Sequence, residues 1–237
     1  MAAKTSKNSD SSTQARYIPV RAGLYPIFVA AFVVVFVISN ITASKGVTIG
    51  PLVTDGAFFL FPIAYVIGDV LAECYGFKAT RVAIWTGFAA AWGAVVAFYI
   101  AIWLPAADFY ENQEAFSTVL GFVPQIVAAS LAGYAVGQLL NAWVLTKMKN
   151  RNAAAPLWQR LMGSTVVGEF GDTLVFCLIA ATAIGISTVP DFVNYVVVGF
   201  VWKTLMEAIL LPVTYKVVAW VKQREMPSSA AVVDSVA

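Results

Sequence analysis

The sequence predicts an all-α membrane protein with six transmembrane helices and cytoplasmic N and C termini. Of its 237 residues, 60% are hydrophobic and only 12% are charged, whereas soluble domains carry about 25% charged residues. Six apolar stretches have the roughly 20 residues that a helix needs to cross a hydrocarbon core about 30 Å thick. Lys and Arg gather in alternate connections between these stretches. The composition therefore suits a bilayer better than water.

The predicted helices occupy most of the chain. They span 24–44, 57–74, 82–104, 119–146, 163–187 and 191–221. We expect one transmembrane domain over 23–222, a disordered cytoplasmic tail at 1–22 and a second cytoplasmic tail at 223–237. The ends are polar, and no short apolar segment with a small-residue cleavage site follows the first of them, so we expect no signal peptide.

Basic residues decide the orientation, because short loops rich in Lys and Arg stay on the cytoplasmic side. One side of the predicted bundle carries Lys4, Lys7, Arg16, Arg21, Lys78, Arg81, Lys147, Lys149, Arg151, Arg160, Lys216, Lys222 and Arg224. The opposite side carries Asp55, Asp108, Glu111, Glu114 and Asp191, with Lys45 as its only basic residue. The net charge of +2 follows from this bias and gives no reason to expect nucleic-acid binding.

The first two helices carry polar residues where a lipid-facing helix would continue apolar. Asn40 belongs to a polar cluster that ends at Lys45, which predicts that this end of the first helix faces the bundle. Residues 46–55 are expected to form an outer loop. Pro62 can occupy a first helical turn or kink the helix. Asp69 and Glu73 lie one turn apart on one face of the second helix.

The third and fourth helices differ in character. The third carries Trp and Tyr residues that favour a structural, partly lipid-facing role. The fourth carries a stripe of small and polar side chains, which lets helices approach closely and lets amides bond across the contact. Its amides are therefore candidates for interhelical hydrogen bonds or for substrate contacts, and the stripe is compatible with a homodimer. The stripe consists of Ser130, Gly133, Tyr134, Gly137, Gln138 and Asn141.

Charged residues inside the last two helices are the strongest functional signal. Glu169 and Asp172 interrupt the fifth helix, and Lys203 and Glu207 lie one turn apart in the sixth, at a similar predicted depth. One ammonium cannot neutralise three carboxylates, so one of them must be protonated, hydrated or reserved for a ligand. Asp69 and Glu73 lie nearer the inner face, and interfacial pairing with Lys78 or Arg81 is an alternative for them.

The charges predict a polar, planar ligand. Two parallel charge-assisted hydrogen bonds from adjacent N–H donors to a carboxylate would fix a heterocycle in orientation. Candidate stacking faces are Phe170, Phe176, Tyr195, Phe200 and Trp202. Cys74 and Cys177 have no CxxC spacing, and the chain contains no His, so neither a disulfide nor a metal site is expected.

At these residues the chain resembles the queuosine precursor transporter family, also called the vitamin uptake transporter family. The matching stretches recur in five of the predicted helices, from about residue 20 to 225. They are Asn40–Lys45, Phe61–Pro62, Gly68–Gly76, Arg81, Ala129–Tyr134, Gly137–Gln138, Asn141, Ser164–Thr165, Gly168–Glu169, Asp172, and Lys203 through Glu207 and Pro212.

This resemblance implies a six-helix importer of 7-deazaguanine precursors of the tRNA nucleoside queuosine, in the bacterial inner membrane. The expected partners are that small molecule and the lipid bilayer, and no cofactor is expected. In our hypothesis Glu169 or Asp172 accepts the paired N1–H and 2-NH₂ donors, and Lys203, Gln138 or Asn141 donates to the 6-oxo group. The candidate substrate-binding residues are Glu169, Asp172, Lys203, Glu207, Gln138, Asn141, Asn40, Asp69 and Glu73.

Two other functional classes stay open at this point. A binding subunit that needs a separate energising module is the first; no Walker A sequence is present in the chain. A membrane enzyme that uses carboxylates for acid and base chemistry is the second, although no convincing nucleophile motif supports it. The acidic motifs of the second and fifth helices also suit an inverted repeat of two three-helix halves.

Overall fold

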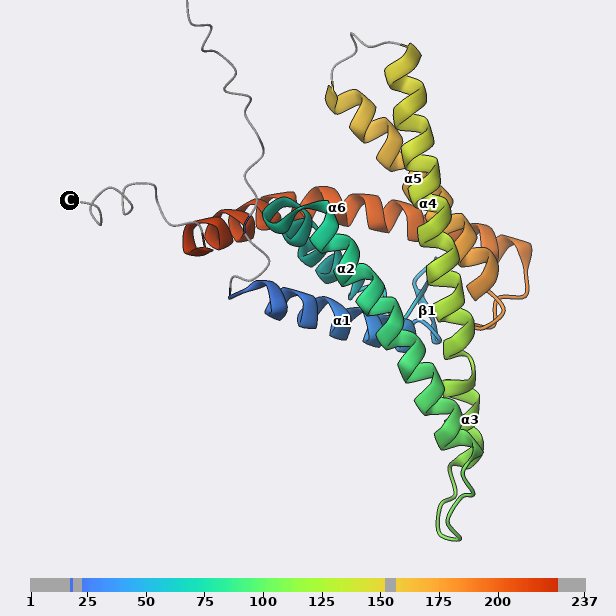
Figure 1. Ribbon diagram of the computed structural model, residues 1–237. Helices are drawn as coiled ribbons and strands as arrows, with labels where there is room; N and C mark the ends of the chain where they lie inside the picture. The colour runs from blue at the N-terminus through green and yellow to red at the C-terminus, as the bar shows by residue number, and fades with distance from the viewer. Residues whose placement is uncertain (1–17, 19–22, 152–156, 226–237) are drawn as a thin grey trace, which may run out of the picture.

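The computed structural model describes residues 18, 23–151 and 157–225, so the predicted tails lie largely outside the described residues. The described chain is mostly helical (Figure 1). Its helices are α1 (Tyr25–Thr42), α2 (Phe61–Trp103), α3 (Gln113–Gly121), α4 (Val123–Arg151), α5 (Leu157–Ala180) and α6 (Val189–Glu225). A small sheet adds β1 (Gly46–Ile49) and β2 (Leu52–Asp55).

Within the described residues, five helical runs are long and apolar enough to cross a membrane, because the predicted second and third helices are joined in α2. A straight helix of its 43 residues would measure roughly 64 Å, about twice the hydrocarbon thickness. The run is broken at Gly76, whose φ of 83° and ψ of 168° are not helical. Gly tolerates positive φ because it has no Cβ. Residues from both arms of α2 line one cavity, so the chain folds back at this glycine.

The segment 46–55, expected to be a loop, is instead an antiparallel β-hairpin in which Gly46 pairs with Asp55. Gly50 has a φ of 60° at the first position of its two-residue turn, which is the position where tight hairpins favour Gly. Asn194 of α6 holds the hairpin: its Oδ1 accepts from Val53 N at 2.9 Å, and its Nδ2 donates to the Pro51 carbonyl at 2.8 Å. The long-range contact with α6 could not be read from the local sequence.

Helices α4 and α5 run side by side (Figure 1), and glycines make their approach possible. A methyl group added at Gly133 would lie 2.8 Å from the Asp172 carbonyl oxygen, and one added at Gly168 would lie 2.8 Å from that of Gly137. The small-residue stripe of the predicted fourth helix therefore packs within the chain. This intramolecular contact accounts for the pattern that was compatible with a homodimer.

The end of the molecule that carries the C-terminal turn of α6 is closed by polar contacts. Tyr75 donates to Glu225 at 2.8 Å, and Glu225 also accepts from the backbone N–H of Leu24. Lys222 donates to Glu73 at 2.6 Å. These bonds tie α6 to both α1 and the first arm of α2, around a core that includes the fully buried Leu71.

Candidate functional site

A cavity of about 420 Å³ lies between the helices, within the roughly 300–1,000 Å³ typical of small-molecule sites. It is lined by α1, both arms of α2, α4 and α5, and by one residue of α6. All but two of the predicted substrate-binding residues lie in its wall, the exceptions being Glu73 and Glu207. Those that line it are Asn40, Asp69, Gln138, Asn141, Glu169, Asp172 and Lys203.

Lys203 is the centre of the ionic wall. Its side chain is only 10% exposed, and its Nζ lies 2.7 Å from Asp172 Oδ2 and 3.5 Å from Glu169 Oε1. The same ammonium lies over the ring of Phe61, 5.4 Å from its centroid. A group that is so poorly hydrated is kept charged by such partners. Two carboxylates around one ammonium leave this wall with an excess acceptor capacity.

The two carboxylates are held differently. One oxygen of Asp172 accepts from Lys203, and the other lies against α4, where a methyl group added at Gly133 would come within 2.8 Å of it. Glu169 is farther from the ammonium and accepts from the Tyr65 hydroxyl at 3.3 Å. Glu169 therefore has the greater capacity to accept hydrogen bonds from a ligand.

Tyr65 is a wall residue that the sequence interpretation missed. It precedes Asp69 by four residues and follows Phe61 by four, so all three lie on one face of a helix. All three line the cavity. The four-residue spacing could have identified Tyr65 from the sequence, because Asp69 already indicated which face of the helix turns toward the pocket.

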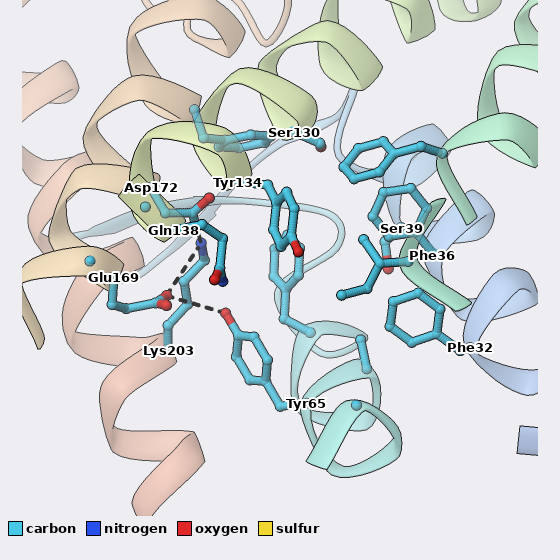
Figure 2. A pocket seen from close by; sticks show the side chains of 18 of the residues that line it. Phe32, Phe36, Ser39, Tyr65, Ser130, Tyr134, Gln138, Glu169, Asp172 and Lys203 are labelled. Carbon is cyan, nitrogen blue, oxygen red and sulfur yellow. Dashed lines mark hydrogen bonds and ion pairs between the residues drawn. The ribbon is translucent and has the colours of Figure 1, made fainter. Parts of the chain in front are cut away.

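Aromatic rings form the opposite wall. Figure 2 shows Phe32 and Phe36 across the pocket from Glu169 and Lys203, with the ring of Tyr134 between the two sides. Phe36 and Phe88 meet edge to face with centroids 4.9 Å apart, and Phe88 contacts the ring of Tyr134. Flat apolar ring surfaces thus lie opposite the ionic groups. These rings come from α1, α2 and α4.

This aromatic wall corrects the predicted stacking residues, of which only Phe176 lines the main cavity. Phe170 is half exposed and packs edge to face with Phe200. Trp202 donates to the Phe58 carbonyl at 2.8 Å, and Tyr195 donates to Asp55 at 2.7 Å. Proximity in sequence to Glu169 and Lys203 was misleading, since neighbours along a helix point to different faces.

The three predicted amide side chains differ in whether they are already hydrogen-bonded within the protein. Asn40 uses both ends of its side chain within the bundle: Nδ2 donates to the Phe36 carbonyl at 2.8 Å and Oδ1 accepts from Ser130 at 2.8 Å. Gln138 is exposed along the cavity wall. Asn141 Oδ1 is buried and has no hydrogen-bond partner among the described residues. A buried acceptor without a partner is costly, so Asn141 is suited to a donor on a ligand.

Glu73 and Glu207 are the two predicted residues that do not line the cavity. The Glu73 side chain is 62% exposed and pairs with Lys222, not with Lys78 or Arg81. Its position one turn beyond Asp69 carries it out of the cavity. Glu207 is half-buried and lies outside the lining, although it is close enough to Glu169 and Asp69 for their charges to interact. The sixth helix thus offers only Lys203 to the pocket.

Comparison with known proteins places this site in a family. Residues 55–217, more than half of the chain, match the family model described as "Putative vitamin uptake transporter". The chain belongs to the vitamin uptake transporter family. The matched range begins at the last residue of β2 and contains every pocket residue that α2, α4, α5 and α6 contribute. Membership and the membrane-length helices together make it a multi-pass membrane transporter.

Curated relatives of this vitamin uptake transporter carry more specific names. A "Probable queuosine precursor transporter" of Bacillus subtilis is 26% identical over 180 residues, which cover 76% of this chain and 78% of the relative. The "Queuosine precursor transporter" of Escherichia coli is 28% identical over 142 residues, covering 60% and 62%. A Haemophilus influenzae relative, also "Probable queuosine precursor transporter", is 28% identical over 120 residues, covering 51% and 48%. No solved structure matches the chain.

Proposed function

We propose that this protein imports queuosine precursors of the 7-deazaguanine class across the bacterial inner membrane and so supplies tRNA modification. The names of its relatives support the substrate class. The observation that carries the proposal is the pocket itself: an ionic wall with one buried ammonium and two carboxylates faces aromatic rings inside an apolar bundle. A flat, polar heterocycle fits both walls.

The substrate's hydrogen-bonding edge matches the ionic wall. A deazaguanine presents N1–H and 2-NH₂ donors side by side, which a carboxylate accepts as two charge-assisted hydrogen bonds. Glu169 is the better candidate for this role because one oxygen of Asp172 already accepts from Lys203 at 2.7 Å and the other lies close to Gly133 of α4. Lys203 would donate to the 6-oxo group, and Asn141 Oδ1 would accept from a remaining ring N–H.

The remaining surface of the base would stack on aromatic side chains. Phe36 lies across the cavity from Lys203, and the ring of Tyr134 lies between them (Figure 2). Offset stacking contributes about 0.5–1.5 kcal/mol beyond burial of the ring area. The combination would distinguish a deazaguanine from an apolar molecule of similar size, because an apolar ligand would leave the carboxylates without donors.

We also propose that the chain crosses the membrane six times. The break at Gly76 divides α2 into a shorter arm, 61–75, and a longer arm, 77–103, which together have more than the roughly 40 residues that two crossings need. The exposed Lys78 and Arg81 follow this break, and Lys222 and Arg224 end α6. The excess of basic residues supports a cytoplasmic location for these ends and for both termini.

Uptake of a labelled precursor by the purified protein in liposomes tests the function. We expect the wild-type protein to transport 7-cyano-7-deazaguanine without a partner, which would also separate a self-sufficient transporter from a subunit that needs an energising module. Glu169→Gln and Asp172→Asn should each reduce uptake at least tenfold, whereas the matched surface variant Glu114→Gln should not. Uptake unchanged by both pocket substitutions would refute the proposed site.

A further inference from the structure

A second, smaller cavity of about 20 Å³ lies beside the main pocket, large enough for one water molecule. Lys203, Phe61 and Phe176 line both cavities, so the two adjoin at these side chains. The far side of the small cavity is formed by Asp55 and Tyr195. It therefore lies between the ionic wall of the main pocket and the hairpin.

Asp55 is a buried carboxylate without a cationic partner. It is 4% exposed, and its two oxygens accept only from neutral groups: Ala57 N at 2.9 Å and the Tyr195 hydroxyl at 2.7 Å. No ion pair reaches it in the described part of the chain, where Lys203 pairs with Asp172 and Glu169 instead. Burial raises the pKa of the Asp55 carboxyl, against the opposing effects of its two hydrogen bonds and the charge of Lys203.

Thr173 provides an independent observation. Thr173 lines the small cavity and is 1% exposed, and its hydroxyl is buried and has no hydrogen-bond partner among the described residues. A helical Thr ordinarily bonds to a carbonyl of the preceding turn, so a buried and unpartnered hydroxyl needs another group. A water molecule in the cavity would satisfy it and would lie between Asp55 and Lys203.

We propose that Asp55 binds the proton that is co-transported with the substrate, and that a water molecule held by Thr173 links it to the Lys203–Asp172 pair. In the forward step the Lys203 ammonium first gives a proton to Asp172, to which it donates at 2.7 Å, and becomes an amine. The amine then accepts a proton from the water, and the Asp55 acid returns a proton to the water. Asp55 ends as a carboxylate, Asp172 ends as an acid, and Lys203 stays an ammonium.

The surroundings favour a proton over a metal cation. The titratable groups that face Asp55 are Tyr195 and Lys203 of α6 and Cys177 of α5. The nearby ammonium would repel a second cation. Within the described ranges no group of three His, Cys, Asp or Glu side chains could hold a metal ion. A neutral water that relays a proton is not repelled by the ammonium and needs no cluster of metal ligands.

Such a relay would carry a proton from Asp55, on the predicted outer side, to Asp172 in the wall of the substrate pocket. Protonation of Asp172 would leave Lys203 with Glu169 as its remaining carboxylate partner, 3.5 Å away. The net charge of the ionic wall would therefore change each time a proton reaches Asp172. This inference rests on the proposed function, because it assigns the driving force for the same substrate.

The test uses the full-length protein in liposomes with an imposed pH gradient, acidic outside, and labelled 7-cyano-7-deazaguanine. We expect the wild-type protein to accumulate substrate above equilibrium and to lose this accumulation when a protonophore is added. Asp55→Asn should lower gradient-driven accumulation at least tenfold, while substrate affinity in detergent stays within about threefold. Thr173→Val, which leaves the carboxylate in place, should lower accumulation several-fold.

Asp191→Asn is the matched control, because Asp191 is an exposed carboxylate at the start of α6 that bonds to Thr188. It should accumulate substrate as the wild-type protein does. Accumulation by Asp55→Asn or Thr173→Val with wild-type dependence on the pH gradient would overturn the relay. So would accumulation driven by a sodium gradient alone. If the wild-type protein binds no deazaguanine, the proposed function itself fails, and that outcome is distinct from binding without proton coupling.

Discussion

Helix α5 and the first arm of α2 each carry two carboxylates about one turn apart, and the two pairs lie in different surroundings. Glu169 and Asp172 both line the pocket and share the buried Lys203. In α2 only Asp69 lines the pocket, while the exposed Glu73 pairs with Lys222. The difference shows that two carboxylates one turn apart on a helix can share one buried pocket or be divided between the pocket and an exposed ion pair.

Removal of the buried ammonium should have the largest effect. Lys203→Met keeps much of the side-chain volume but leaves Glu169 and Asp172 without a cation, which costs about 3–5 kcal/mol for a broken buried pair. We expect a strongly lowered melting temperature in detergent and loss of substrate binding. Lys222→Met is the matched control at the exposed pair and should melt close to the wild-type protein. Equal stability of Lys203→Met and the wild-type protein would show that the ionic wall is hydrated.

The double variant Lys203→Met with Asp172→Asn sharpens this first prediction. It removes one carboxylate together with the ammonium, so part of the lost stability should return. The melting temperature of the double variant should therefore lie above that of Lys203→Met alone. A double variant that is less stable than either single variant would mean that the two side chains do not stabilise one another.

Asp69→Asn should have an intermediate effect. Asp69 lines the pocket but has no ion-pair partner in the described part of the chain, and Glu207 lies close enough to repel it. Loss of this charge should leave the melting temperature unchanged or slightly raised and should lower uptake about tenfold or less, consistent with one charged hydrogen bond of about 1.5 kcal/mol. A clear fall in stability would indicate that Asp69 has a structural role.

Glu73→Gln should have the smallest effect. Exposed ion pairs contribute about 0–1 kcal/mol, and the Glu73–Lys222 pair lies outside the pocket. Uptake should stay within twofold of the wild-type rate when measured beside Asp69→Asn at the same protein density. A loss of uptake as large as that of Asp69→Asn would place Glu73 in the transport cycle and would remove the contrast between the two residues.

Much of this arrangement could be predicted from residue type and spacing. The apolar lengths predicted segments that overlap the observed helices, although residues 75–81, expected to connect two helices, belong to α2. The predicted depths indicated that Glu169, Asp172, Lys203 and Glu207 could lie at one level. The ion pairs at 2.7 and 3.5 Å confirm that Glu169, Asp172 and Lys203 lie together. These predictions succeed because charges buried in hydrocarbon must find one another.

Other features depend on contacts between distant segments and were missed. The hairpin at 46–55 is fixed by Asn194, more than a hundred residues away. The aromatic wall comes from α1, α2 and α4, which approach because Gly76 folds α2 back. Helical periodicity indicates which residues share a face, but it does not indicate which faces meet. The proposed roles of individual side chains, the number of crossings and the domain bounds stay predictions.

Binding of a substrate and of its 2-deamino analogue tests most directly whether Glu169 reads the donor edge of a deazaguanine. Affinities of the purified wild-type and Glu169→Gln proteins would be measured for 7-cyano-7-deazaguanine and for 7-cyano-7-deazahypoxanthine, which lacks the 2-amino group. We predict that loss of the amino group weakens binding to the wild-type protein at least tenfold, as expected for a charged hydrogen bond of about 1.5–3 kcal/mol, and changes binding to Glu169→Gln less than threefold. An equal loss in both proteins would contradict the proposed contact.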